Sequence, residues 1–319
     1  MENRLAIVGS GMIASSLAVL TSGYGVVTDV CVRSGESEKR FWTAFDRHWV
    51  QLEKKGIADR EQIEICRSYV RVTTDYADLR DDRVFFEAVL EDPGVKHDVY
   101  RKIAAACPDV HMIGSCTSAL TPEVLTEGLS ERENADRIIV AHPFNPVHMV
   151  PYFELCGCAQ TREGLLDEMA DLLRQLGRAP VILKKSTPGF IGNRLQYALF
   201  RESVALVEEG VCSFRDIDTA LNYSFCPRYT SIGIFEHFDA AGLKLDATNC
   251  ELLFPLLSDS KEVPEVIRER LAEGKGGQRD LEGFYDWHGV DMEAYAARVN
   301  EPYWRFCHYA FPEKRREDA

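Results

Sequence analysis

The stretch Arg4-Leu5-Ala6-Ile7-Val8-Gly9-Ser10-Gly11-Met12-Ile13-Ala14 decides the fold of the first half of the chain. A short apolar run leads into a G-x-G-x-x-A loop, and residues 12–22 have a helical pattern. Gly9 permits a tight turn, Gly11 lets the backbone approach a pyrophosphate, and Ala14 allows the helix to pack closely on the strand. The free amides and positive dipole at a helix start favour a phosphate. This context predicts a dinucleotide-binding loop formed by Gly9, Gly11, Met12, Ile13 and Ala14.

Strand-like and helix-like segments alternate up to residue 183, which favours a mostly parallel sheet with helices on both faces. The expected strands are residues 4–8, 26–32, 83–88, 110–114, 137–142 and 180–183, and the expected helices are 12–22, 36–55, 96–106, 121–128 and 163–177. After Thr187-Pro188-Gly189 the pattern is helical, over residues 190–210, 214–223, 231–245, 262–273 and 291–299. We therefore expect a Rossmann-type doubly wound α/β domain over residues 1–187 and an all-α substrate and dimerisation domain over residues 188–319.

Composition excludes several classes of partner. The 37 Lys and Arg residues are outnumbered by 51 Asp and Glu residues, which gives a net charge of −14. Nucleic acids and anionic membranes need surplus positive charge, so neither is an expected partner. We expect no signal peptide, no membrane span and a solvated charged tail over residues 312–319. The ten cysteines are scattered, with Cys156-Gly-Cys158 the tightest pair. They predict no metal site and a reducing, cytoplasmic location.

The end of the second predicted strand bears on the choice of nicotinamide cofactor. An Asp or Glu there usually hydrogen-bonds the adenosine ribose. This chain instead has Val32-Arg33-Ser34, with Glu36 further on. Arg33 and Ser34 could bind a 2′-phosphate, which favours NADP. Arg33 as a surface residue, or Glu36 as the ribose ligand, remains open, so the expected cofactor is NAD or NADP.

A histidine and a glutamate form a candidate acid–base pair. His142 ends a predicted strand, where doubly wound sheets place their ligands, and Glu154 follows twelve residues later. Oxidising an alcohol requires a base for the hydroxyl proton, and a carboxylate can orient an imidazole and stabilise its charged form. Spacing alone favours the simpler interpretation of a loop histidine and a surface glutamate.

The order of motifs along the chain instead favours an acid–base pair formed by His142 and Glu154. The five motifs, in chain order, are the G-x-G-x-x-A loop, Glu87-Ala88-Val89-Leu90-Glu91 with Lys96, Cys116-Thr117-Ser118-Ala119-Leu120, His142-Pro143-Phe144-Asn145-Pro146 with Glu154, and residues 187–194 (TPGFIGNR). Over nearly its whole length the chain resembles the 3-hydroxyacyl-CoA dehydrogenase family. Residues 193–198 and 207–210 are most similar to the branch that contains L-gulonate 3-dehydrogenase and carnitine dehydrogenase. Residues 283–287 (GFYDW) resemble the closing motif of the acyl-CoA enzymes.

The resemblance implies a role for each matching residue. His142 would be the general base and Glu154 its orienting partner. Ser118 would hydrogen-bond the reacting oxygen and border the cofactor, and Asn193 would help to position that oxygen. The positions near the nicotinamide would be Glu91, Lys96 and Asn145.

The same resemblance implies direct hydride transfer from the alcohol carbon to the nicotinamide. Cys116 departs from the Asn or Ser that is usual in the family, which weakens one polar contact to the cofactor. Members of the family commonly form homodimers through the helical domain.

The sequence supports three functions. Residues 235–243 and the GFYDW motif favour the leading one, interconversion of a 3-hydroxyacyl-CoA and its 3-oxoacyl-CoA. Arg228, in Pro227-Arg228-Tyr229 before Gly233 and Glu236, matches the gulonate-type branch and could bind a substrate carboxylate. It favours the second function, dehydrogenation of a small free hydroxy acid, although an ion pair with Glu236 or a surface role remains open. The third function is a non-catalytic, crystallin-like protein.

Overall fold

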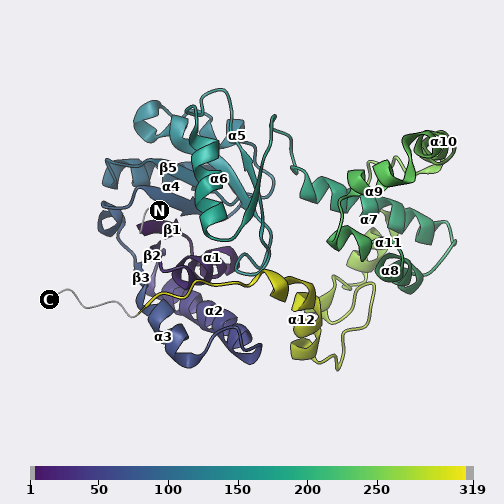
Figure 1. Ribbon diagram of the computed structural model, residues 1–319, viewed down its shortest axis with the longest axis horizontal. Helices are drawn as coiled ribbons and strands as arrows, with labels where there is room; N and C mark the ends of the chain where they lie inside the picture. The colour runs from purple at the N-terminus through teal and green to yellow at the C-terminus, as the bar shows by residue number, and fades with distance from the viewer. Residues whose placement is uncertain (1–3, 314–319) are drawn as a thin grey trace. The chain divides into compact units, whose positions relative to one another are not determined.

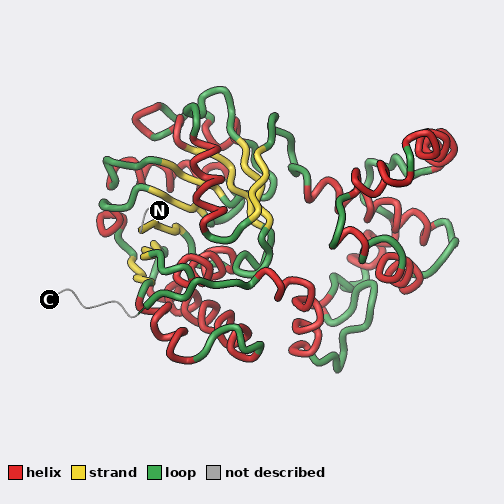
Figure 2. Tube along the Cα trace, in the orientation of Figure 1, coloured by secondary structure: helices red, strands yellow, loops and turns green. Residues whose placement is uncertain are grey.

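The computed structural model describes residues 4–313 and divides them into two compact units (Figure 1). The first unit comprises residues up to 191 together with those from 296 onward, and the second comprises residues 192–295. Figure 2 shows that the strands lie together in the first unit and that the second consists of helices and loops. Residues 314–319, most of the charged tail expected to be solvated, lie outside the described part. No helix within residues 4–313 is long and apolar enough to cross a membrane.

The first unit contains one eight-stranded sheet in the order β3-β2-β1-β4-β5-β6-β7-β8. The strands are β1 (Arg4–Val8), β2 (Val27–Cys31), β3 (Val70–Thr73), β4 (Val84–Glu87), β5 (Met112–Ser115), β6 (Ile138–Pro143), β7 (Tyr152–Cys156) and β8 (Ala179–Ile182). Strands β1 to β6 are parallel, which confirms the predicted Rossmann-type fold. β7 runs antiparallel to β6 and parallel to β8. β3, with four residues, and β7, with five, were not among the predicted strands.

The helices of the first unit pack on the two faces of the sheet. They are α1 (Met12–Gly23), α2 (Gly35–Lys54), α3 (Arg60–Ser68), α4 (Pro93–Ala106), α5 (Pro122–Thr126) and α6 (Leu165–Gln175). One buried cluster joins the sheet to α1, α2, α3 and α6, and another joins it to α4 and α5. The sheet is therefore covered on both sides, as the alternating pattern predicts.

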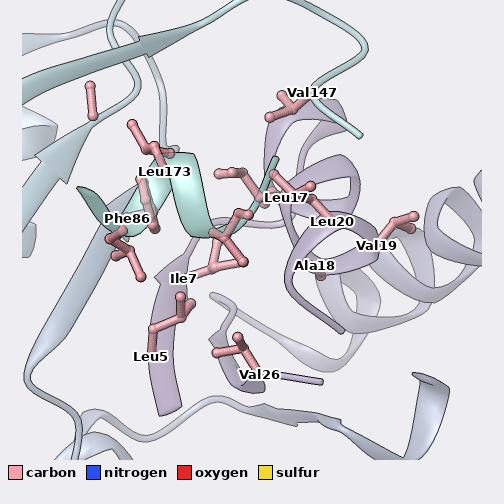
Figure 3. Close-up of a cluster of buried hydrophobic side chains, with 14 of the residues drawn as sticks. Leu5, Ile7, Leu17, Ala18, Val19, Leu20, Val26, Phe86, Val147 and Leu173 are labelled. Carbon is pink, nitrogen blue, oxygen red and sulfur yellow. The ribbon is translucent and has the colours of Figure 1, made fainter. Parts of the chain in front are cut away.

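Side chains along each strand alternate between these two clusters. Leu5 and Ile7 of β1 belong to the cluster with α1, whereas Ala6 and Val8 belong to the cluster with α4. Figure 3 shows Ile7 among side chains from α1 and α6, including Leu17 and Leu173. The period of two thus fixes the face on which every strand residue lies.

The end of the chain returns to the first unit, which differs from the expected helical domain over residues 188–319. Figure 1 shows the yellow C-terminal segment along α1 and α2. The ring of Tyr309 lies 6.1 Å from that of Trp49, and its hydroxyl donates to the His148 carbonyl (2.6 Å). The hydroxyl of Tyr24 donates to the carbonyl of His308 (2.7 Å). Aromatic packing therefore attaches residues 303–311 to the sheet domain, a contact that helical periodicity does not reveal.

The second unit is helical, with short one-residue bridges as its only pairing among the described residues. Its helices are α7 (Gly192–Glu208), α8 (Phe214–Tyr223), α9 (Ile234–Ala241), α10 (Leu243–Leu253), α11 (Glu265–Ala272) and the start of α12 (Met292–Asn300). The helix expected over residues 231–245 is divided at Gly242, whose φ is 102°. Such a φ disfavours residues with a side chain and breaks a helix.

Candidate active site

The loop between β1 and α1 has the backbone geometry of a phosphate-binding loop. Gly9 has φ 142°, and a Cβ there would lie 2.4 Å from the Ala88 carbonyl oxygen. Gly11 is the N-cap of α1, no side chain caps this helix start, and a Cβ on Gly11 would meet nothing within 4 Å. The first turn of α1 therefore offers uncapped amides facing open space, which fits a pyrophosphate.

This loop lies at the switch point of the sheet. β1 pairs with β2 on one side and with β4 on the other. The strand order therefore runs away from β1 on one side through β2 and β3, and on the other side from β4 onward. Ligands of doubly wound sheets bind outside the carboxyl ends of the strands at this point. Asn145, which follows β6, places its side-chain nitrogen 3.1 Å from the sulfur of Met12. The loop that carries Asn145 thus borders the phosphate loop.

The end of β2 has an exposed Arg33 and a capped helix start. The Ser34 Oγ accepts from the Ser37 amide (3.3 Å) and so caps α2. Arg40, one turn further on, donates to Oγ of Ser37 (3.0 Å) and to Glu36 (3.1 Å). Glu36 therefore already has an arginine partner, whereas Arg33 faces solvent.

His142 and Glu154 lie directly opposite each other. They are partners in the antiparallel register of β6 and β7, which explains their twelve-residue spacing. Nδ1 of His142 lies 2.8 Å from Oε2 of Glu154, and His142 is 4% exposed. The Nδ1–H group donates a hydrogen bond to the carboxylate, so Nε2 keeps its lone pair and can accept a proton from another group. The simpler interpretation, a loop histidine and a surface glutamate, does not describe this arrangement.

The second oxygen of Glu154 is also held in place. Its Oε1 accepts from the Tyr152 hydroxyl (3.1 Å) and from the Ile191 amide (2.7 Å). Burial and the Glu154 charge raise the pKa of Tyr152, which keeps the phenol a neutral donor. Tyr152 was missed in the sequence, although its position two residues before Glu154 places both on one face of a strand.

Two aromatic rings enclose the imidazole. The ring of His142 lies 5.2 Å from Phe144 and 5.4 Å from Phe190. Phe190 is buried and has φ 50°, a left-handed conformation that is unusual for a bulky residue. Backbone strain of this kind persists only where the surroundings fix it. Residues 187–190, the turn that carries Phe190, therefore hold the base in position.

The loop after β5 presents Ser118 at the same edge of the sheet. Oε1 of Glu91 accepts from the amides of Ser118 (2.8 Å) and Ala119 (3.0 Å). Lys96, expected near the nicotinamide, is buried and pairs with Glu87. Burial raises the pKa of the Cys116 thiol, so this residue is neutral where the family usually has Asn or Ser.

The remaining predicted residues belong to the second unit. Asn193 is the second residue of α7. Arg228 is exposed and donates from Nη1 to Nε2 of His237 (3.0 Å). Within the described residues Arg228 does not pair with Glu236, which was one of its open interpretations.

The GFYDW motif is part of the internal packing of the second unit. Phe284 lies 4.7 Å from Phe214, measured between ring centroids. The hydroxyl of Tyr285 donates to Asp218 (2.6 Å). The motif therefore has a structural explanation that requires no CoA ligand.

Comparison with known proteins identifies two family models that cover most of the chain. The 3-hydroxyacyl-CoA dehydrogenase NAD-binding domain matches residues 4–186, and the C-terminal domain of the same family matches residues 189–287. An L-carnitine dehydrogenase from Pseudomonas aeruginosa is 31% identical over 282 residues, which cover 86% of this chain and 84% of that protein. A 3-hydroxybutyryl-CoA dehydrogenase from Clostridioides difficile is 27% identical over 289 residues, 89% of this chain and 99% of that protein.

A solved structure supports the same relationship. The crystal structure of 5-formyl-3-hydroxy-2-methylpyridine 4-carboxylic acid 5-dehydrogenase, described as an NAD+ dependent dismutase, superposes with a TM-score of 0.84. It is 27% identical, and the match covers 94% of this chain and 96% of that chain. The chain therefore belongs to the 3-hydroxyacyl-CoA dehydrogenase family and is a dehydrogenase with an NAD-binding domain.

Proposed function

We propose that this protein oxidises the alcohol of a free hydroxy carboxylate, with His142 as the general base. The main support for this reaction is the buried His142–Glu154 pair, in which Nε2 of His142 is left to accept a proton. The phosphate loop that begins at Gly9, together with Asn145, fits a dinucleotide cofactor, with its pyrophosphate at the start of α1.

The mechanism follows from the groups around His142. A bound nicotinamide ring supplies the hydride acceptor. Nε2 of His142 takes the hydroxyl proton while the C–H bond breaks and the C=O bond forms, and it returns the proton in the reverse reaction. Glu154 stabilises the imidazolium that results. Ser118 is proposed to hydrogen-bond the reacting oxygen, and the family resemblance implies that Asn193 helps to orient it.

Arg228 supports a free carboxylate as the substrate. An exposed guanidinium that uses Nη1 for His237 keeps other N–H donors for a two-point contact with a carboxylate. The sequence around Arg228 resembles that of the gulonate-type branch. The internal packing of Phe284 and Tyr285 removes one reason for expecting acyl-CoA. A relative with a pyridine carboxylate in its name superposes over 94% of this chain. These observations support a free hydroxy acid as the substrate that we propose, in place of the thioester that the sequence favours.

A substrate screen tests this proposal. The purified protein is assayed with free 3-hydroxy acids and with 3-hydroxyacyl-CoA thioesters, and nicotinamide absorbance is followed with NAD and with NADP. We expect turnover of free acids, and we expect Arg228→Ala to raise their KM at least tenfold. Activity on thioesters alone would overturn the proposal in favour of a 3-hydroxyacyl-CoA dehydrogenase. Absence of turnover with every substrate would favour the crystallin-like alternative.

For the cofactor we propose NADP. Arg33 is exposed at the end of β2, and Ser34 caps the helix that follows. The Glu36 carboxylate, the acidic alternative for binding the ribose, is paired with Arg40. We expect kcat/KM for NADP to exceed that for NAD, and Arg33→Ala to lower only the value for NADP. A strong preference of the wild-type protein for NAD would contradict this assignment.

We also propose a homodimer formed through the second unit. Helices α8, α9, α10 and α11 contain no buried residue in the described protomer. Phe235 is 88% exposed and Leu256 is 73% exposed. Apolar side chains gathered in this way indicate a surface that a partner covers. Light scattering after gel filtration should give the mass of two chains, and a monomer would contradict the assignment.

A reducing compartment, the cytoplasm, fits the cysteine chemistry. All ten cysteines are free. The partners that we propose are a cofactor, a small anionic substrate and a second copy of this chain. Neither nucleic acid nor a membrane is a proposed partner. Fractionation of the native cells tests the location.

A further inference from the structure

Lys96 joins two carboxylates beneath the candidate active site. It lies on α4 and is only 1% exposed. Its Nζ lies 2.8 Å and 3.1 Å from the two oxygens of Glu87, and 3.4 Å from Oε2 of Glu91. One ammonium group therefore balances two carboxylates, which leaves one negative charge in excess.

Glu87 is the fixed end of this chain of contacts. Besides Lys96, it accepts from the hydroxyls of Tyr100 (2.9 Å) and Ser115 (2.7 Å) and from the Val89 amide (2.8 Å). A buried charge is tolerated when it is paired and hydrogen-bonded in this way. Both oxygens of Glu87 are therefore occupied by protein donors, and the residue anchors Lys96 to β4 and β5.

Glu91 is the end that faces the site. Its side chain is 41% exposed. Its Oε1 accepts from the Thr117 hydroxyl (2.5 Å) and from the amides of Ser118 (2.8 Å) and Ala119 (3.0 Å). One carboxylate oxygen therefore shapes the loop that presents Ser118.

These contacts lie beside the phosphate loop. Ala88 lies between Glu87 and Glu91 in the sequence. Its carbonyl oxygen would be only 2.4 Å from a Cβ on Gly9. Ser118 follows β5, which is two strands from β1 in the sheet. The position of Ser118 is therefore linked to the edge of the sheet where the cofactor and the reacting oxygen are expected.

The charges around Glu91 keep it ionised. Burial raises the pKa of Glu91, but the Thr117 hydrogen bond, the Lys96 charge and the two amides outweigh burial, so the pKa is lowered overall. The other titratable groups around Lys96 are Glu87, Tyr100 and Cys116. Burial and the nearby Glu87 raise the pKa of both Tyr100 and Cys116, so these two groups remain neutral.

We propose that Lys96 is a positioning residue for the dehydrogenase reaction: it holds Glu91 as a carboxylate in the orientation that fixes the Ser118 loop. This role rests on the proposed function of Ser118, and it differs from the cofactor contact that the family resemblance implies for Lys96. Lys96 acts through Glu91 and Ser118 and does not touch the reacting atoms.

The test compares Lys96→Met with Lys102→Met. Methionine keeps the length of the lysine side chain and removes its charge. Lys102 lies on the same helix, is exposed and pairs with Asp98 (2.7 Å), so it serves as the matched control. We expect Lys96→Met to lower kcat at least tenfold while the Kd of the cofactor changes less than threefold. Lys102→Met should resemble the wild type in both.

A pH profile separates this role from a merely structural one. Without the ammonium group Glu91 should take up a proton at higher pH, so the fall of kcat toward acidic pH should begin at a higher pH in Lys96→Met than in the wild type, where protonation of His142 sets it. Because an amide does not titrate, the double variant Lys96→Met/Glu91→Gln should lose this shift and fall at acidic pH as the wild type does. A Lys96→Met profile parallel to that of the wild type would overturn the proposal, as would loss of cofactor binding with kcat unchanged at saturation.

Hydrogen exchange gives a readout that needs no turnover. The amides of Ser118 and Ala119 should exchange faster in Lys96→Met than in wild type or Lys102→Met, and unchanged exchange would count against the proposal. If wild-type protein shows no dehydrogenase activity while these amides respond as expected, the proposed function fails and the link from Lys96 to the loop stands. If Lys96→Met does not fold, Glu91→Ala takes its place, with faster exchange expected and Glu91→Gln expected to restore slow exchange.

Discussion

The two units of the protein differ in which kind of side chain they bury. In the first unit, ionisable side chains such as His142 and Lys96 are buried against carboxylates on β7 and β4. In the second, apolar side chains such as Phe235 and Leu256 lie exposed on helices that have no buried residue. The proposed catalytic pair therefore lies within one unit, whereas the exposed apolar side chains of the helical unit are the basis of the proposed dimer.

The largest expected effect comes from the catalytic pair of the first unit. Glu154→Gln removes the charge that stabilises the imidazolium and disturbs the orientation of His142. We expect kcat to fall by about 10²–10⁴-fold, the range typical of such groups. Steady-state kinetics on a free hydroxy acid measures it.

Tyr152→Phe is the matched control for this variant. It removes one hydrogen bond to the same carboxylate and leaves the contact between Glu154 and His142 intact. We expect a loss of less than tenfold. Equal losses in the two variants would show that packing of β7, and not the Glu154 charge, supports catalysis.

The next effect contrasts leucines of the two units. Leu17 on α1 is buried in the main core, and Leu17→Ala should lower the free energy of unfolding by about 2–5 kcal/mol. Leu256→Ala should change the unfolding of the protomer little and should weaken the dimer. Urea unfolding and concentration-dependent light scattering measure the two quantities. A large loss of protomer stability in Leu256→Ala would remove the contrast.

Acid sensitivity distinguishes histidines of the two units. Burial and the nearby Arg47 lower the pKa of His48 to about 4, and its ring lies 4.5 Å from that of His148. The folded state therefore binds fewer protons than the unfolded chain. The stability from neutral His48 is present above about pH 6.5 and is lost as the pH falls toward 4, on the order of 2–3 kcal/mol.

His48→Phe should reduce this loss of stability at acidic pH. His288→Phe, a change at an exposed histidine of the second unit, should leave the pH dependence as in the wild type. Urea unfolding at pH 7 and pH 5 measures the difference. An unchanged pH dependence in His48→Phe would show that other groups cause the acid sensitivity.

Local sequence signals predicted much of the first unit and less of the second. The strand–loop–helix sequence at Gly9 and Gly11 is a short-range feature, so its position and geometry could be inferred. The contact between His142 and Glu154 depends on the register of an antiparallel pair, and spacing alone could not establish it.

Other features depend on long-range packing. The burial of Lys96 requires Glu87 from a different element of the fold, and the motif match does not reveal this pair. The return of Tyr309 to Trp49 joins residues 260 positions apart in the sequence, which no periodic pattern encodes. The division at Gly242 was missed because apolar periodicity continues through it, although its backbone leaves the helical region.

The most direct test of the account is the activity of His142→Gln together with its cofactor affinity. Because His142 takes the hydroxyl proton and the phosphate loop binds the dinucleotide, we predict a fall in turnover of orders of magnitude with a nearly unchanged Kd for the cofactor. A variant that turns over free hydroxy acids at a near-normal rate would contradict the assignment of His142 as the base.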